Sequence, residues 1–90
     1  MPNPGNGKMR LLLAEDNKRL QELLAEALRK SAYRVDVVNS VAGILHNMAA
    51  ADYSLLVIDR GLIDGDGLDA VRSVRSAKAM MPRYRRPAWR

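Results

Sequence analysis

Two short apolar runs, each ending in acidic residues, constrain the fold of this chain more than any other feature. The run Met9–Ala14 ends in Glu15 and Asp16, and the run Leu55–Ile58 ends in Asp59. Nearly continuous apolar runs of this length are typical of strands buried on both faces of a parallel sheet. Because open α/β sheets hold their sites at the carboxyl ends of their strands, we expect three carboxylates to lie side by side there.

A cluster of carboxylates at a sheet edge predicts a site for a cation. Three neighbouring negative charges repel one another unless a cation neutralises them. Oxygen ligands that leave room for water and phosphate favour Mg2+ over Ca2+ or Zn2+. The alternative is that each acid only ends its strand or caps the helix that follows.

The rest of the chain alternates between strand-like and helix-like patterns, as βαβ units do. A short strand is expected at Val35–Val38, and helices from about Lys18 to Ser31, after Ser40 and after Asp66 as N-caps. The expected buried faces of the first two helices comprise Leu20, Leu23, Leu24, Ala27, Leu28, Val41, Ile44, Leu45 and Met48. Right-handed crossovers then give an α/β sheet with the strand order 2-1-3.

These acids and elements resemble the receiver domain of bacterial two-component response regulators, a CheY-like member of the flavodoxin-like folds. The matching segments are Leu11–Asn17, Tyr53–Asp59 and Leu62–Leu68. The resemblance implies that Asp59 is the aspartate that accepts phosphate. It also implies that Glu15 and Asp16 bind Mg2+ together with Asp59, and that the backbone carbonyl of Gly61 supplies a further ligand.

The function implied by this resemblance is that of a receiver module in a phosphorelay, which is not an enzyme in its own right. A sensor histidine kinase would donate the phosphoryl group. One departure is Ile63, where the family usually has Pro, so the loop after Asp59 is expected to be less rigid. Asp64 and Asp66 are expected to serve the turn and the helix cap rather than the metal.

The resemblance covers residues 8 to 79 and then stops. A receiver normally continues through two more strands, which bring a Ser or Thr and a Lys, and no residue here corresponds to either. Residues 72–90 hold seven basic residues and no acid. We therefore expect a flexible N-terminus at 1–8, a partial receiver domain at 9–79 and a basic tail at 80–90, with phosphorylation impaired by the truncation. A phosphorylation-silent module for dimerisation or interaction is the alternative function.

The basic tail allows three interpretations. It can be a solvated tail, an arm that binds anions or nucleic acid, or foreign sequence that follows a change of reading frame near Met81. No helix-turn-helix pattern follows, so sequence-specific DNA binding is not expected.

The outer edge of the third strand is expected to be bare and apolar, which predicts a homodimer formed through that edge. The chain has no cysteine, residues 1–8 lack the apolar core typical of a signal peptide, and no apolar stretch reaches the roughly 20 residues that would span a membrane. The cytoplasm is therefore the expected compartment.

Overall fold

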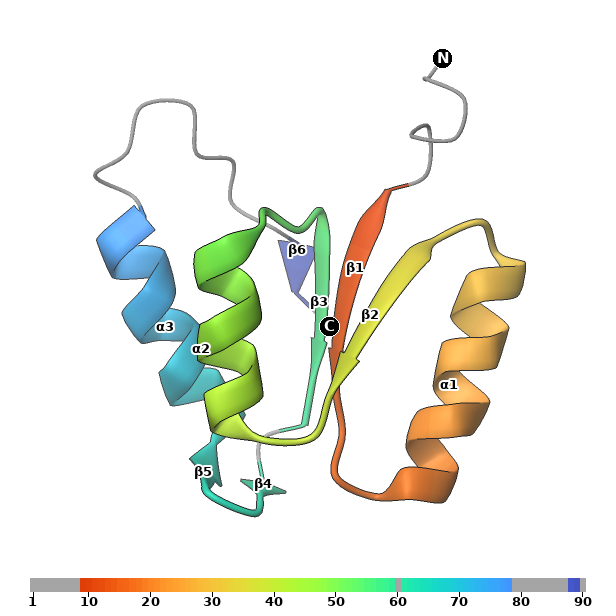
Figure 1. Cartoon of the computed structure of the whole chain (residues 1–90), viewed down its shortest axis with the longest axis horizontal. Coiled ribbons are helices and arrows are strands. Elements are labelled where there is room, and N and C mark those ends of the chain that lie inside the picture. Colours follow the sequence, from red (N-terminus) through yellow and green to blue (C-terminus); the bar gives the residue numbers. More distant parts are fainter. Residues whose placement is uncertain (1–8, 60, 79–87, 90) are drawn as a thin grey trace.

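A four-stranded parallel sheet forms the centre of the computed structural model, which describes residues 9–59, 61–78 and 88–89 (Figure 1). The strands are β1 (Arg10–Ala14), β2 (Arg34–Val38), β3 (Leu55–Ile58) and β6 (Ala88–Trp89). They lie in the order β2-β1-β3-β6, and each neighbouring pair is parallel. The predicted order 2-1-3 is confirmed, with one strand more beside β3.

Within the described residues, three helices cover the two faces of the sheet. Helix α1 (Lys18–Lys30) lies alone on one face, and α2 (Val41–Ala50) and α3 (Gly67–Lys78) lie on the other (Figure 1). A small antiparallel hairpin of β4 (Gly61–Leu62) and β5 (Gly65–Asp66) joins β3 to α3. None of the helices in the described part of the chain is long and apolar enough to cross a membrane.

The run that forms β1 is apolar throughout because its side chains alternate between two cores. Leu11 and Leu13 pack beneath α1. Leu12 and Ala14 point to the opposite face and join a larger core beneath α2 and α3. All four residues are at most 1% exposed, so a polar residue anywhere in this run would be buried without water.

The predicted buried faces of the helices are partly wrong. In α1, Leu20 and Leu23 are 43% and 59% exposed, and Ala25 is the residue buried against the sheet. In α2, Leu45 is 40% exposed, whereas Ile44 is fully buried. Helical spacing identifies a broad apolar stripe, but a helix that packs against one flat sheet buries only the middle of such a stripe.

The expectation of a bare edge on β3 is also wrong at two positions. Strand β6 pairs there in parallel, with Ala88 opposite Leu55 and Trp89 opposite Leu56. The unpaired backbone groups of an apolar edge accept any available strand, including one from the same chain. The predicted N-terminus 1–8 lies outside the described residues, as does the predicted tail 80–90 apart from Ala88–Trp89, so the proposed domain boundaries stay predictions.

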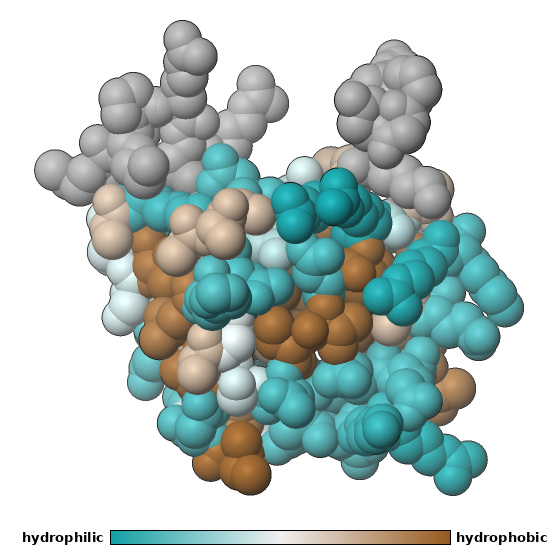
Figure 2. Space-filling view, viewed as in Figure 1, coloured by the Kyte–Doolittle hydropathy of each residue, from teal (hydrophilic) through white to brown (hydrophobic). Residues whose placement is uncertain are grey.

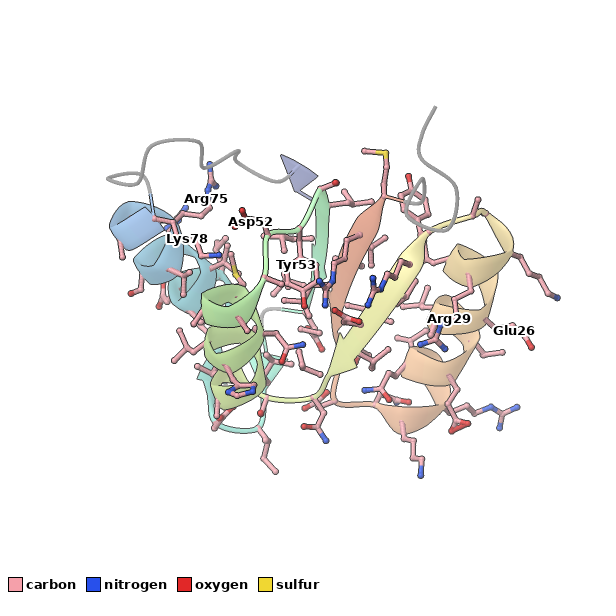
Figure 3. The ribbon with its side chains drawn as sticks, turned by 45° about the horizontal axis from the view of Figure 1, so that its top comes forward. Glu26, Arg29, Asp52, Tyr53, Arg75 and Lys78 are labelled. Carbon is pink, nitrogen blue, oxygen red and sulfur yellow. The ribbon has the colours of Figure 1, made fainter. Side chains whose placement is uncertain are left out.

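The C-terminal end of α3 is held against the end of α2. Lys78 donates from Nζ to the backbone oxygen of Ala51 at 3.0 Å and forms an ion pair with Asp52 at 2.9 Å. Figure 3 shows Lys78 and Asp52 close to each other at the same end of the two helices. The lysine thus satisfies a carbonyl at the C-terminus of α2, where a positive charge is favourable.

A polar network that the sequence analysis did not identify joins β1 and β2 to Tyr53, which precedes β3 and lies over the sheet in Figure 3. The Tyr53 hydroxyl donates to Asp36 at 2.8 Å, and Arg10 donates to the same carboxylate oxygen at 3.0 Å. The Arg10 guanidinium also lies 5.3 Å from the centre of the Tyr53 ring. Burial raises the pKa of Asp36, but the hydrogen bonds from Tyr53 and Arg10 outweigh burial and hold that pKa below its usual value. Burial and the bond to Asp36 raise the pKa of Tyr53.

The network predicts how the free energy of unfolding depends on pH. The lowered pKa of Asp36 contributes stability above its unfolded value of about 3.9, and this is lost as pH falls through the folded pKa. The raised pKa of Tyr53 contributes stability below about 10, and this is lost as pH rises through the folded pKa. Tyr53→Phe should remove the alkaline part and cost about 1.5–3 kcal/mol at neutral pH, as loss of a hydrogen bond to a carboxylate does.

Thermal melts at a series of pH values measure both effects. Tyr33→Phe is the matched control, because Tyr33 packs beside the other core. An alkaline loss of stability of the same size in wild type and Tyr53→Phe would contradict this account.

Candidate functional site

Three carboxylates meet at the carboxyl edge of the sheet. Glu15 and Asp16 follow β1, Asp59 follows β3, and each offers an oxygen that lies within 4.8 Å of the others. The strand register brings them together: Ala14 is paired with Ile58, and the backbone N–H of Asp59 donates to the Ala14 oxygen at 2.9 Å. Both strands therefore end at the same level, as the sequence predicts.

The three acids differ in their surroundings. Glu15 is 9% exposed, Asp59 is half-buried and Asp16 is exposed. The Glu15 carboxylate accepts the backbone N–H of Asn17 at 3.1 Å, and the Asp59 carboxylate accepts that of Gly61 at 3.2 Å. These two bonds orient the carboxylates but do not remove their charge.

No ion pair found within residues 9–59 and 61–78 involves the cluster, since the pairs there join Arg10 to Asp36 and Lys78 to Asp52. The donors are all oxygen, and they lie close enough together, within 4.8 Å of one another, to contact one ion of the kind that prefers oxygen ligands. The donor set therefore fits a hard divalent cation.

Helix α1 takes its N-cap from Asn17 rather than from the acidic cluster. The Asn17 side chain accepts the backbone N–H of Leu20 at 3.0 Å. The side chain of Gln21 donates to the backbone oxygen of Glu15 at 2.9 Å, which ties the first turn of α1 to the end of β1. Because another residue caps the helix, capping does not explain why Asp16 is acidic.

The connection between Asp59 and α3 returns very close to β3. A Cβ atom on Gly67 would lie 2.6 Å from the Asp59 backbone oxygen and 2.6 Å from the Ile58 Cγ2 atom. Glycine is therefore required where this connection closes. Asp66 accepts the backbone N–H of Leu68 at 2.8 Å, so its predicted role at the start of α3 is confirmed.

Asp64 has a role that the sequence analysis missed. Its carboxylate reaches the start of α2, where it accepts the backbone N–H groups of Val41 at 2.6 Å and Ala42 at 3.1 Å. These two bonds lower the pKa of Asp64. No local pattern could have revealed this contact, because the helix start precedes Asp64 by 23 residues.

The predicted site residues fall into two groups. Glu15, Asp16 and Asp59 lie together. Gly61 lies beside them through the bond from its N–H to Asp59, while metal binding by its carbonyl stays a prediction. Ile63, at the tip of the hairpin, is 84% exposed and contributes nothing to the cluster. A hydrophobic spot over this hairpin is visible at the lower left of Figure 2.

Comparison with known proteins gives one consistent family. The sequence model of the response regulator receiver domain matches residues 11–84, which extends past residue 79, where the resemblance was expected to stop. Transcriptional regulatory protein CusR of Escherichia coli strain K12 is 36% identical over 74 residues, covering 82% of this chain and 33% of that protein. The chain thus spans about a third of the length of this relative.

Solved structures agree with the observed fold. The non-phosphorylated HemR receiver domain from Leptospira biflexa has a TM-score of 0.73 at 31% identity, over 83% of this chain and 60% of that one. The response regulator TrrA from Thermotoga maritima, solved in complex with Mg2+-BeF, has a TM-score of 0.73 at 25% identity. That alignment covers 79% of this chain and 62% of TrrA.

Proposed function

This chain belongs to the response regulator receiver domain family, and we propose on that basis that it accepts a phosphoryl group at Asp59 in a two-component phosphorelay. Receiver domains are signalling modules. The observation that carries the proposal is the meeting of three carboxylates at the carboxyl edge of the sheet, with Asp59 half-buried among them. The partner would be a sensor histidine kinase, and the module would work in the cytoplasm.

In the proposed reaction, a carboxylate oxygen of Asp59 attacks the phosphorus of a phosphohistidine. The new O–P bond forms as the N–P bond breaks, and the histidine nitrogen takes the electron pair. The backbone N–H of Gly61 donates a hydrogen bond to the Asp59 carboxylate at 3.2 Å and so holds this carboxylate in place. Glu15 and Asp16 would hold Mg2+ together with Asp59, and the bound ion would supply neutralisation of charge on the phosphoryl oxygens.

Neutralising two acids of the cluster should remove the metal site without removing the nucleophile. The double variant Glu15→Gln, Asp16→Asn is expected to weaken Mg2+ binding more than about tenfold, because two of three charged ligands are lost. Titration calorimetry measures the affinity. The control is Glu22→Gln, Glu26→Gln, which neutralises two exposed acids of α1. Equal affinities of the two double variants would place the metal elsewhere.

A homodimer through the edge of β3 remains the second candidate, as a module that interacts without phosphorylation. Strand β6 pairs with Leu55 and Leu56, and among the described residues no strand pairs with Val57 or Ile58 on that side. This half of the edge is apolar and could pair with a second copy. Light scattering tests the proposal: a monomer mass at micromolar concentration would contradict it. A dimer that acetyl phosphate leaves unmodified would favour it over phosphoryl transfer.

A further inference from the structure

We propose that Asp64 is a positioning residue: it clamps the β4–β5 hairpin (Gly61–Asp66) to the start of α2 and thereby sets the affinity of the acidic cluster for Mg2+. The second half of this inference rests on the proposed function. Asp64 itself is exposed and does not belong to the cluster. Its effect on the cluster would pass through the hairpin.

The first turn of α2 is completed by an acceptor from the hairpin. A helix leaves its first N–H groups without partners inside the helix. Here the Ser40 side chain accepts the N–H of Gly43 at 3.0 Å, while Asp64 accepts those of Val41 and Ala42 with its two oxygens. A negative charge at this position is also favoured by the helix dipole. The helix start and the hairpin therefore hold each other.

The hairpin also approaches α2 through its backbone. Leu62 is buried, but the neighbouring Ile63 is 84% exposed. The backbone at Gly65 has a φ of +147° and approaches α2 so closely that a Cβ there would lie 3.3 Å from the Val41 Cγ2 atom. The Asp64 carboxylate thus adds two hydrogen bonds to this close approach between the hairpin tip and α2.

The other end of the hairpin meets the site. The Gly61 N–H donates to the Asp59 carboxylate, so a hairpin that moves away from α2 also moves the donor that orients this carboxylate. Residues that orient metal ligands through hydrogen bonds commonly change metal affinity even though they do not touch the ion. Asp64 acts one step further out, through the backbone of the hairpin.

Asp64→Ala and Ser40→Ala form a matched pair of variants. Both remove a side-chain acceptor from the first turn of α2, but only Asp64 belongs to the hairpin. In the full chain, Asp64→Ala should speed hydrogen exchange across Gly61–Asp66 about tenfold or more, as opening of a local unit does. It should weaken Mg2+ binding in calorimetry by about tenfold, the lower end for residues that orient ligands.

Ser40→Ala should speed exchange only in the first turn of α2 and leave the Mg2+ affinity within about twofold of wild type. Asp64→Asn should restore part of both losses, because the amide oxygen still accepts one hydrogen bond. Hairpin exchange in Asp64→Ala equal to that of wild type would overturn the clamp. A loosened hairpin with unchanged Mg2+ affinity would overturn the positioning role.

The two proposals can fail separately. A wild-type chain that binds no Mg2+ would contradict the proposed function and the effect of Asp64 on affinity. The exchange rates would still decide whether Asp64 holds the hairpin.

Discussion

Asp59→Asn should abolish formation of the phosphoprotein when the chain is incubated with acetyl phosphate and Mg2+. An amide oxygen lacks the charge that makes the carboxylate a nucleophile, and no other acid of the cluster is both half-buried and bonded to Gly61. Intact-mass spectrometry should find one added phosphoryl group on wild type and none on the variant. The expected effect is complete loss, which makes it the sharpest test of the proposed function.

A matched variant separates the role of Asp59 from a general loss of negative charge. Asp69→Asn removes one exposed acid in the first turn of α3, outside the cluster. It should be phosphorylated to the same extent as wild type. If Asp59→Asn were modified as fully as Asp69→Asn, another residue would have to be the acceptor, and the assignment of Asp59 would fail.

Gly67→Ala should have the largest effect on stability among small substitutions near the site. The new methyl group would lie 2.6 Å from the Asp59 backbone oxygen, which belongs to the main chain and cannot rotate away. The start of α3 would have to shift away from the end of β3, at a cost of about 1–3 kcal/mol for an overpacked contact. That is a large part of the roughly 5–15 kcal/mol that holds a typical domain folded. Urea unfolding measures the loss.

Gly61→Ala makes the same chemical change in the same connection and serves as the control. A Cβ on Gly61 would meet no atom within 4 Å. The free energy of unfolding should therefore change by less than about 0.5 kcal/mol, as at an ordinary surface position. Equal losses in the two variants would mean that the close approach of Gly67 to Asp59 does not carry the effect.

The parts of the fold that were predicted correctly depend on local patterns. Strands β1 and β3 lie in nearly continuous apolar runs, and each helix begins after a residue that can cap it, as Ser40 and Asp66 do. The meeting of Glu15, Asp16 and Asp59 follows from two strands that end at the same level. Strand order needed only the crossover rule, because helices separate the strands.

The parts that were missed depend on contacts between distant segments. The neighbouring sequence does not reveal the roles of Asp64 and Tyr53, because their hydrogen bonds reach to α2 and β2. The face that α1 buries depends on how the helix is rotated on the sheet, and the six apolar residues in its sequence allow more than one rotation. The pairing of Ala88–Trp89 is hidden by a composition rich in Arg and Pro.

The central place of β1 has a consequence for the rate of folding. Leu11 pairs with Val35 on one side and with Leu55 on the other, and a whole helix intervenes in the chain before each partner. Sheets built from such distant pairings form slowly for their size. The entropy cost of closing each loop comes before the favourable strand contacts that offset it. During synthesis both edges of β1 stay unpaired until β2 and β3 have been made. The rate of folding, rather than the free energy of unfolding, therefore sets how long an apolar strand edge is exposed to other chains.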